Sequence, residues 1–306
     1  MKKVWLEFYD DPVPATIEFE NVPLHVWLDR SAQQWPNHTA IKFMNFSMDY
    51  AQFKDVSAIV AENLRLLGVT RGDRIALMLP NLPQMIIAYW AVMRLGAVAV
   101  MMNPLYMESE LLHQLNDADV RVIIVLDSVW SKVAAVWDRV PLEKAVIVMT
   151  SGEATTTINN KKTYAWETLL QPNSGYTCPD MTAEDLAMLQ YTGGTTGVSK
   201  GCMLTHANLS ANLEQTEKMF HVLSLGTEKF VGVLPYFHIY GLTVSMNLAV
   251  KMGATMLPLP RFTPQSLLQL FDEERPTCMP AAPAIFNALL QQKDIDTHDL
   301  TSLKLC

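Results

Sequence analysis

The sequence predicts an α/β fold made of two related parallel-sheet subdomains, the second of which is incomplete. Short apolar runs alternate with amphipathic segments along most of the 306 residues, which is typical of strands alternating with helices. Some of these runs are apolar on both faces, as strands are when helices cover both sides of a sheet. The alternation breaks at residues 150–162 and later resumes. We therefore expect a first subdomain with an N-terminal extension at residues 1–180 and a second at 181–306.

In the first subdomain, the segment 82–95 predicts a buried helix that Gly96 ends, with a buried strand after it. Because Arg94 interrupts the apolar stretch at 85–102, we expect this stretch to lie in a protein core rather than in a membrane. The other expected strands are 39–44, 74–79, 120–126 and 144–149, and the other expected helices are 51–68, 108–118 and 128–137.

The second subdomain repeats the alternation. Its expected strands are 185–191, 229–235 and 254–260, and its expected helices are 207–220, 242–253, 264–274 and 283–292. The run at 300–306 resembles a strand that is unfinished, so we expect the second sheet to be incomplete.

Composition excludes several classes of function. Half of the residues are hydrophobic, 18% are charged and the net charge is −8, which argues against a nucleic-acid partner. The four cysteines have neither metal-site nor disulfide-framework spacing, which favours a reducing compartment. The N-terminus does not resemble a signal peptide, so a cytoplasmic location is expected. The aromatic residues Trp5, Phe8 and Tyr9 near the N-terminus would permit peripheral membrane contact, and the sequence leaves open whether the protein forms a homodimer.

The glycine-rich segment, YTGGTTGVSKG at residues 191–201, is the most informative part of the chain. It contains four of the 13 glycines, which are costly inside helices and strands and therefore indicate a loop. Glycine lets the backbone approach a ligand closely, while the threonine hydroxyls, free N–H groups and Lys200 are suited to binding phosphate.

Other interpretations of this segment stay open. A Walker A loop would require glycine at Ser199 and Ser or Thr at Gly201, so that motif fails twice. The letters GVSKG fit a nucleophile elbow with Ser199 as nucleophile, and Asp272 and His298 follow in a permissible order for a serine hydrolase. However, an elbow joins a strand to a helix, whereas a strand-like run follows here. A simple turn between two strands would need fewer glycines.

The glycine-rich segment and the following MLTHANL resemble the phosphate-loop signature of the acyl-adenylate-forming enzymes, the acyl-CoA synthetase superfamily. The segments MKKVW, ALMLPNLPQ, NPLY, LQYTGGTTG and FNALL are more narrowly similar to bacterial long-chain fatty acid–CoA ligases. The resemblance runs from Met1 to Cys306 and implies the two related subdomains of that superfamily's large N-terminal domain. One departure is Ser199, where many members have proline.

The resemblance implies a reaction in two steps. A fatty carboxylate attacks the α-phosphate of ATP and releases pyrophosphate, and the thiol of coenzyme A then displaces AMP from the acyl-adenylate. Positioning and charge stabilisation by the protein suit this chemistry, with Mg²⁺ and Lys200 at the phosphates. Thr192 matches a position that contacts Mg²⁺ in some members. The phosphate-binding positions implied by the match are Tyr191, Thr192, Gly193, Gly194, Thr195, Thr196, Gly197 and Lys200.

A second candidate group is LPYFHIYG at residues 234–241. A lone histidine among aromatic residues is more often structural than catalytic, but the family places a similar histidine beside the carboxylate that is activated. The resemblance therefore implies a catalytic role for His238, with Tyr236, Phe237 and Tyr240 beside the acyl chain. Leu242 stands where some long-chain relatives have a gating tryptophan. Of the other histidines, His206 is expected to help begin a helix, and His25, His38, His113 and His221 are expected to face solvent.

The sequence-based hypothesis is thus an ATP-dependent fatty acid–CoA ligase with ATP, Mg²⁺, coenzyme A and a fatty acid as ligands. Family members carry, beyond the matched region, segments for adenine, ribose and a catalytic lysine, so we expect residues 1–306 not to complete the reaction alone. A serine hydrolase and a non-catalytic nucleotide- or lipid-binding module are the alternatives.

Overall fold

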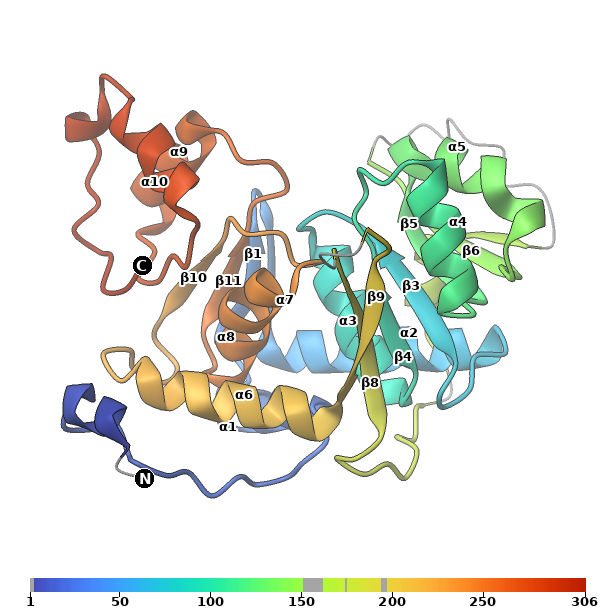
Figure 1. The fold of residues 1–306 in the computed structure, drawn as a ribbon, viewed down its shortest axis with the longest axis horizontal. Coiled ribbons are helices and arrows are strands. Elements are labelled where there is room, and N and C mark those ends of the chain that lie inside the picture. The colour runs from blue at the N-terminus through green and yellow to red at the C-terminus, as the bar shows by residue number, and fades with distance from the viewer. Residues whose placement is uncertain (1–2, 151–161, 174, 194–196) are drawn as a thin grey trace.

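The computed structural model describes residues 3–150, 162–173, 175–193 and 197–306. Within these ranges, strands form two sheets that lie side by side with helices between and around them (Figure 1). The mixed α/β architecture with parallel sheets confirms the predicted fold class.

The larger sheet contains seven strands among the described residues, in the order β7-β6-β5-β3-β4-β8-β9. Neighbouring strands are parallel except for the antiparallel pair β8 and β9. The strands are β3 (Arg74–Met78), β4 (Val98–Met101), β5 (Val122–Leu126), β6 (Lys144–Val148), β7 (Thr163–Ala165), β8 (Leu186–Thr192) and β9 (Lys200–Thr205).

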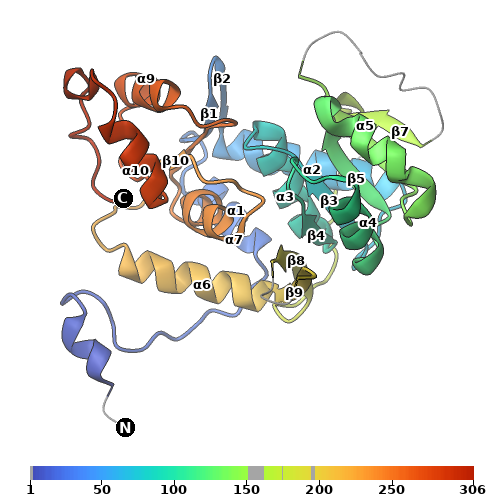
Figure 2. The same ribbon diagram turned by 45° about the horizontal axis from the view of Figure 1, so that its top comes forward.

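Its inner strands are buried on both faces because alternate residues enter two different cores. In β3, Ile75 and Leu77 pack into a central core, whereas Ala76 and Met78 face helices α4 and α5. These helices, α4 (Glu108–Asp117) and α5 (Asp127–Val136), cover the outer face in both views (Figures 1 and 2). Double coverage explains the continuous apolar runs of the sequence.

The smaller sheet has the order β10-β11-β1-β2 within the described residues. Its strands are β1 (Thr39–Phe43), β2 (Phe46–Asp49), β10 (Lys229–Gly232) and β11 (Thr255–Pro258). The expected strand at 300–306 forms a single parallel bridge, between Leu305 and Cys278, and Cys278 in turn bridges to Phe230 of β10. Helices α9 (Pro264–Glu274) and α10 (Pro283–Leu290) pack in a third core with residues of the β10 segment.

The two sheets exchange segments across the expected boundary at residue 180. Strand β1 from the first half pairs with β11 in the smaller sheet and brings β2 with it, and β8 and β9 from the second half complete the larger sheet. The division between sheets therefore differs from the sequential division at residues 1–180 and 181–306. Which strands pair depends on how segments that are distant in the sequence bury their apolar faces together. The local periodicity of the sequence contains no information on these distant partners.

The central core joins the sheets through α2 (Tyr50–Leu66) and α3 (Pro83–Leu95). Helix α3 begins with Pro83 and ends at Gly96, whose φ of 69° is the left-handed conformation that favours glycine at a helix end. Nearly every α3 side chain is buried, and Arg94, 5% exposed, forms an ion pair with Asp29 at 2.5 Å. Among the described residues, no helix combines the length and apolarity needed to span a bilayer.

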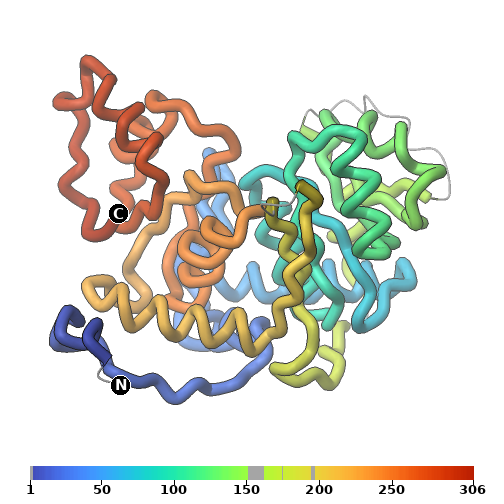
Figure 3. Tube along the Cα trace, in the orientation of Figure 1, coloured from blue at the N-terminus to red at the C-terminus, as the bar shows by residue number. Residues whose placement is uncertain are grey.

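The remaining helices are α1 (His25–Gln34), α6 (His206–Met219), the short α7 (Ile239–Gly241), a π-helical segment at Leu242–Asn247 and α8 (Leu248–Lys251). The N-terminal segment runs alongside α6 (Figure 3), where the backbone N–H of Glu20 donates to the carboxylate of Glu214 at 3.3 Å. His221, just beyond α6, pairs with Asp10 at 2.9 Å. These contacts hold the N-terminal extension against the fold.

Two buried histidines begin helices α1 and α6. The expectation that His25 faces solvent is wrong, because His25 is buried, and His206 is fully buried at the first position of α6. The Nδ1 atom of His206 accepts from the backbone N–H of Leu24 at 3.2 Å. Burial and then the charge of Arg94 lower the pKa of His25 to about 4. Burial and then His25 lower the pKa of His206 to about 4.

We expect the free energy of unfolding to fall as pH falls from about 6.5 to about 4. The unfolded chain binds a proton at each histidine near pH 6.5, whereas the folded chain does so near pH 4. This contribution to stability is therefore complete above pH 6.5 and is lost progressively as the pH falls from 6.5 to about 4. At pH 5 the loss is on the order of 2 kcal/mol per histidine. Urea unfolding at pH 7 and pH 5 measures it. The variant His206→Asn should weaken the pH dependence, and His38→Asn at an exposed position is the matched control; equal slopes in all three proteins would contradict the prediction.

Candidate functional site

The glycine-rich segment connects β8 to β9. Thr192 pairs with Lys200 and Tyr191 with Gly201, so the segment turns back at the carboxyl end of β8. Since β8 is parallel to β4, this turn lies at the edge where the carboxyl ends of the parallel strands meet. In open α/β sheets that edge is where ligands bind. The predicted phosphate ligands Gly194, Thr195 and Thr196 lie outside the described residues.

Tyr191 holds the first stem of this turn. Its side chain is 7% exposed, and its hydroxyl donates to Oδ2 of Asp117 at 2.5 Å. Burial, followed by Asp117, raises the pKa of Tyr191 well above its usual value. A Cβ on Gly201, directly opposite, would lie 3.0 Å from the Tyr191 ring, so glycine permits this close approach. Tyr191 therefore supports the turn from the side.

Lys200 begins the second stem and is exposed. Within the described ranges its ammonium contacts no carboxylate, which leaves it available to an anion. Thr192 and Gly193 are exposed on the other stem, as is Gly197, whose φ of 94° is left-handed. Exposed N–H groups, hydroxyls and one cation at the end of a hairpin match the requirements of a phosphate site.

The second predicted group, residues 234–241, is fixed beside this turn by two amide side chains. Asn81 donates to the carbonyl oxygens of Gly232 and Leu234 at 2.7 and 2.8 Å and accepts from the backbone N–H of Tyr236 at 2.7 Å. The Nε2 amide of Gln190, in β8, donates to the carbonyl of Phe237 at 3.2 Å. The histidine-bearing turn is thus tied directly to the strand that carries the glycine-rich segment.

His238 is exposed and caps helix α7. Its Nδ1 atom accepts from the backbone N–H of Tyr240 at 3.2 Å, and within the described part of the chain Nε2 has no hydrogen-bond partner, so it can meet a ligand. Gly241 allows the turn to close, since a Cβ there would lie 2.5 Å from the carbonyl oxygen of Pro235. Backbone atoms cannot give way easily, so this position requires glycine.

A cavity of about 390 Å³ brings the two predicted groups together. It lies between the ends of β4 and β8 and the turn before α7. Its lining residues are Met101, Asn103, Tyr106, Gln190, Tyr191, Thr192, Gly193, Phe237, His238 and Ile239.

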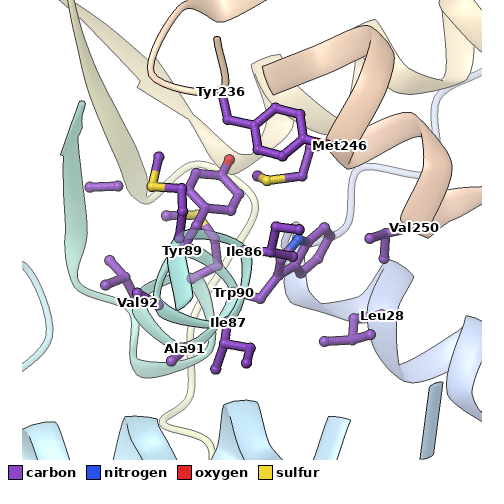
Figure 4. Close-up of a cluster of buried hydrophobic side chains, with 14 of the residues drawn as sticks. Leu28, Ile86, Ile87, Tyr89, Trp90, Ala91, Val92, Tyr236, Met246 and Val250 are labelled. Atoms are coloured by element: carbon purple, nitrogen blue, oxygen red, sulfur yellow. The ribbon is translucent and has the colours of Figure 1, made fainter. Parts of the chain in front are cut away.

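Two predicted substrate residues lie elsewhere. Tyr236 is fully buried and points into the central core beside Tyr89 and Met246 (Figure 4). Tyr240 is half exposed and lines a separate shallow pocket with residues of α6, including Thr216. Of the four predicted substrate residues, Phe237 and His238 line the cavity, and the neighbouring Ile239 lines it too.

Residues of the alternative hydrolase interpretation occupy separate environments. Ser199 leads into strand β9 rather than into a helix, and its carbonyl accepts from His113. His298 contacts Asp272 at 2.7 Å, and Asp272 belongs to α9, which lies away from the β9 hairpin in both ribbon views (Figures 1 and 2).

Comparison with known proteins identifies the family. The family model described as AMP-binding enzyme matches residues 28–306. The chain belongs to the AMP-binding enzyme family. It is 36% identical to a long-chain-fatty-acid–CoA ligase from Bacillus subtilis (strain 168), over 100% of this chain and 58% of the relative. A ligase of the same name from Salmonella typhimurium is 34% identical over 100% of this chain and 59% of the relative.

Solved structures share the fold of this chain. A long-chain-fatty-acid-CoA ligase from Archaeoglobus fulgidus superposes with a TM-score of 0.83 at 25% identity, covering 96% of this chain and 59% of that one. ATP-bound MatB from Rhodopseudomonas palustris superposes with a TM-score of 0.78 at 26% identity, covering 93% and 54%. The chain thus spans less than two thirds of the length of these relatives.

Sequence reasoning missed four residues that organise this candidate site. His113 was expected to face solvent, yet it is partly buried against the glycine-rich segment. Its spacing of four from Asp117 on one helix was the available signal. Asn81 and Gln190 are amides within or beside apolar runs, and a polar residue in such a run indicates a specific hydrogen-bonding task.

Proposed function

We propose that this AMP-binding chain takes part in ATP-dependent activation of a long-chain fatty acid, through an acyl-adenylate, to its coenzyme A thioester. The observation that carries the proposal is the cavity that joins the end of the glycine-rich hairpin to the turn of His238. The named activity of the relatives and the ATP bound to one structural neighbour support it.

In the proposed first step, a carboxylate oxygen of the fatty acid bonds to the α-phosphorus of ATP, and the bond to pyrophosphate breaks. Lys200 and the exposed N–H groups of the hairpin bind the phosphate oxygens as charge collects on the leaving group. In the second step, the thiol of coenzyme A attacks the acyl carbonyl and AMP leaves. The reaction needs no nucleophile from the protein.

His238 is proposed to meet the reacting carboxylate through its free Nε2 atom. Phe237 lines the same cavity and would contact the start of the acyl chain. Tyr236 would support this turn from the core, and Tyr240 would flank it at the surface.

Magnesium is proposed to arrive with the nucleotide. Within the described residues, no group of three or more His, Cys, Asp or Glu side chains could hold a metal ion. We therefore propose that phosphate oxygens and water supply most of the Mg²⁺ ligands and that the Thr192 hydroxyl supplies one. When bound, the ion would neutralise charge on the phosphates.

We also propose a cytoplasmic enzyme in peripheral contact with membrane. The support is the N-terminal turn Val4–Phe8, where Trp5 is 53% and Phe8 85% exposed. Aromatic side chains are favoured at the membrane–water interface.

The test follows pyrophosphate release and acyl-CoA formation by the full-length protein with palmitate, ATP, Mg²⁺ and coenzyme A. Both products are expected to depend on the fatty acid, whereas acetate should support little turnover. A chain of residues 1–306 assayed in parallel should not complete the reaction, since it matches 58% of the Bacillus relative. Absence of fatty-acid-dependent pyrophosphate release, together with fluorophosphonate labelling lost in Ser199→Ala, would replace the ligase by a hydrolase.

A further inference from the structure

Helix α4 contacts both stems of the glycine-rich hairpin. His113 and Asp117 are four residues apart and therefore project from the same face of this helix. His113 Nε2 lies 2.7 Å from the carbonyl oxygen of Ser199, immediately before β9. Asp117 Oδ2 accepts from the hydroxyl of Tyr191, near the end of β8, at 2.5 Å. The two side chains thus contact the two stems of the hairpin, one at Ser199 and the other at Tyr191.

A third contact connects these two anchors. The rings of His113 and Tyr191 meet edge to face, with centroids 6.2 Å apart and planes at 86°. This arrangement is favourable for aromatic pairs. Because Tyr191 is also in contact with Gly201, the side chains of α4 and the two stems form one packed unit.

The contact at Ser199 fixes the direction of a peptide plane. The carbonyl of Ser199 and the N–H of Lys200 belong to the same rigid peptide, so a donor on that carbonyl also sets where the Lys200 backbone begins. The anchor at Tyr191 acts through the side chain instead, because the bond from its hydroxyl to Asp117 holds the ring that packs beside Gly201. Holding both ends before a ligand arrives lowers the entropic cost of binding.

We propose that His113 and Asp117 are positioning residues that hold the described stems of the glycine-rich hairpin, residues 191–193 and 197–201, in place for a nucleoside triphosphate. The proposal rests on the proposed function of that segment as a phosphate site. Neither residue needs to touch the nucleotide, since His113 acts through the backbone of Ser199 and Asp117 through the side chain of Tyr191. His113 donates from Nε2, and Asp117 receives the Tyr191 hydroxyl.

The test compares His113→Ala with His113→Gln in the full-length protein. His113→Ala should raise the KM for ATP about tenfold, the effect of one lost hydrogen bond, with the KM for palmitate little changed. His113→Gln keeps an amide donor and should recover part of this loss. Asp117→Ala should act in the same direction, with Asp117→Asn, which keeps an acceptor oxygen, as its conservative partner. His221→Ala, at the N-terminal contact, is the matched control and should leave the KM for ATP unchanged.

A second readout separates this proposal from the function on which it rests. Without nucleotide, hydrogen exchange of the described stems, residues 190–193 and 197–205, should accelerate about tenfold in His113→Ala, while urea unfolding matches the wild type. Faster exchange in a protein that never uses ATP would support the positioning role and overturn the proposed function. Unchanged exchange and unchanged KM for ATP in both His113→Ala and Asp117→Ala would overturn the positioning role. If His113→Ala does not fold, the exposed Asp117 variants decide the question.

Discussion

Replacing Lys200 by alanine is expected to lower fatty-acid-dependent pyrophosphate release by about 100- to 1,000-fold. This is the usual cost of removing one group that stabilises charge in a transition state. Lys200 is exposed at the start of β9, and within the described residues no carboxylate neutralises it. Its charge is therefore free to follow the leaving pyrophosphate. The measurement is the pyrophosphate release rate at saturating palmitate and ATP in the full-length protein.

The controls for Lys200→Ala separate charge from folding. Lys200→Arg retains the charge and should keep more activity than the alanine variant, although its geometry differs. Lys218→Ala removes a half-exposed lysine from α6, away from the cavity, and should leave the rate unchanged. Because Lys200 is exposed, its loss should not alter unfolding by urea. A Lys200→Ala rate within twofold of the wild type would remove this residue from the mechanism.

Replacing Trp90 by alanine is expected to lower the free energy of unfolding by about 3–5 kcal/mol. Trp90 lies in the middle of α3 with no exposed surface, at the centre of the core that joins the two sheets (Figure 4). Its ring packs edge to face with Phe53 of α2 at 6.4 Å and with Tyr89 at 6.0 Å. Truncation to alanine would leave a cavity that these rigid neighbours cannot fill. Urea unfolding at pH 7 measures the loss.

Trp90→Phe provides the graded comparison. The indole Nε1 has no hydrogen-bond partner among the described residues, so phenylalanine removes a buried, unpaired donor while it fills most of the space. Its loss of stability should be clearly smaller than that of Trp90→Ala. Trp5→Ala, at a half-exposed position near the N-terminus, should change stability by less than about 0.5 kcal/mol. Equal losses in Trp90→Ala and Trp5→Ala would contradict this account of the core.

Most helices and strands could be predicted because their causes are local. The expected helix 82–95 is observed at Pro83–Leu95, with proline at its start and left-handed Gly96 at its end. The expected strand 74–79 is observed at Arg74–Met78. Proline, glycine and the period of apolar residues act within a few positions of each other, so a single sequence displays them.

The site was predicted in part. The glycine-rich segment and His238 were identified from their residues and from a family resemblance, and the structure brings the described part of that segment and His238 to one cavity. The sequence could not show which of Tyr236 and Phe237 enters the core and which lines the cavity. Both are aromatic and adjacent, yet one enters the core and the other lines the cavity. Only the position of the turn against Asn81 and Gln190 decides which side chain faces which way.

The sequence by itself determined the α/β class, the order of the elements and a hairpin end suited to phosphate, because periodicity, glycine content and residue chemistry are properties of short segments. Only the tertiary structure decided that β1 and β2 join the smaller sheet, that β8 and β9 complete the larger one, and that His113 contacts Ser199. The pairings of β1 with β11 and of β4 with β8, and the contact of His113 with Ser199, join residues 86 or more positions apart. Their free energy comes from burial and hydrogen bonds formed only when the whole chain folds.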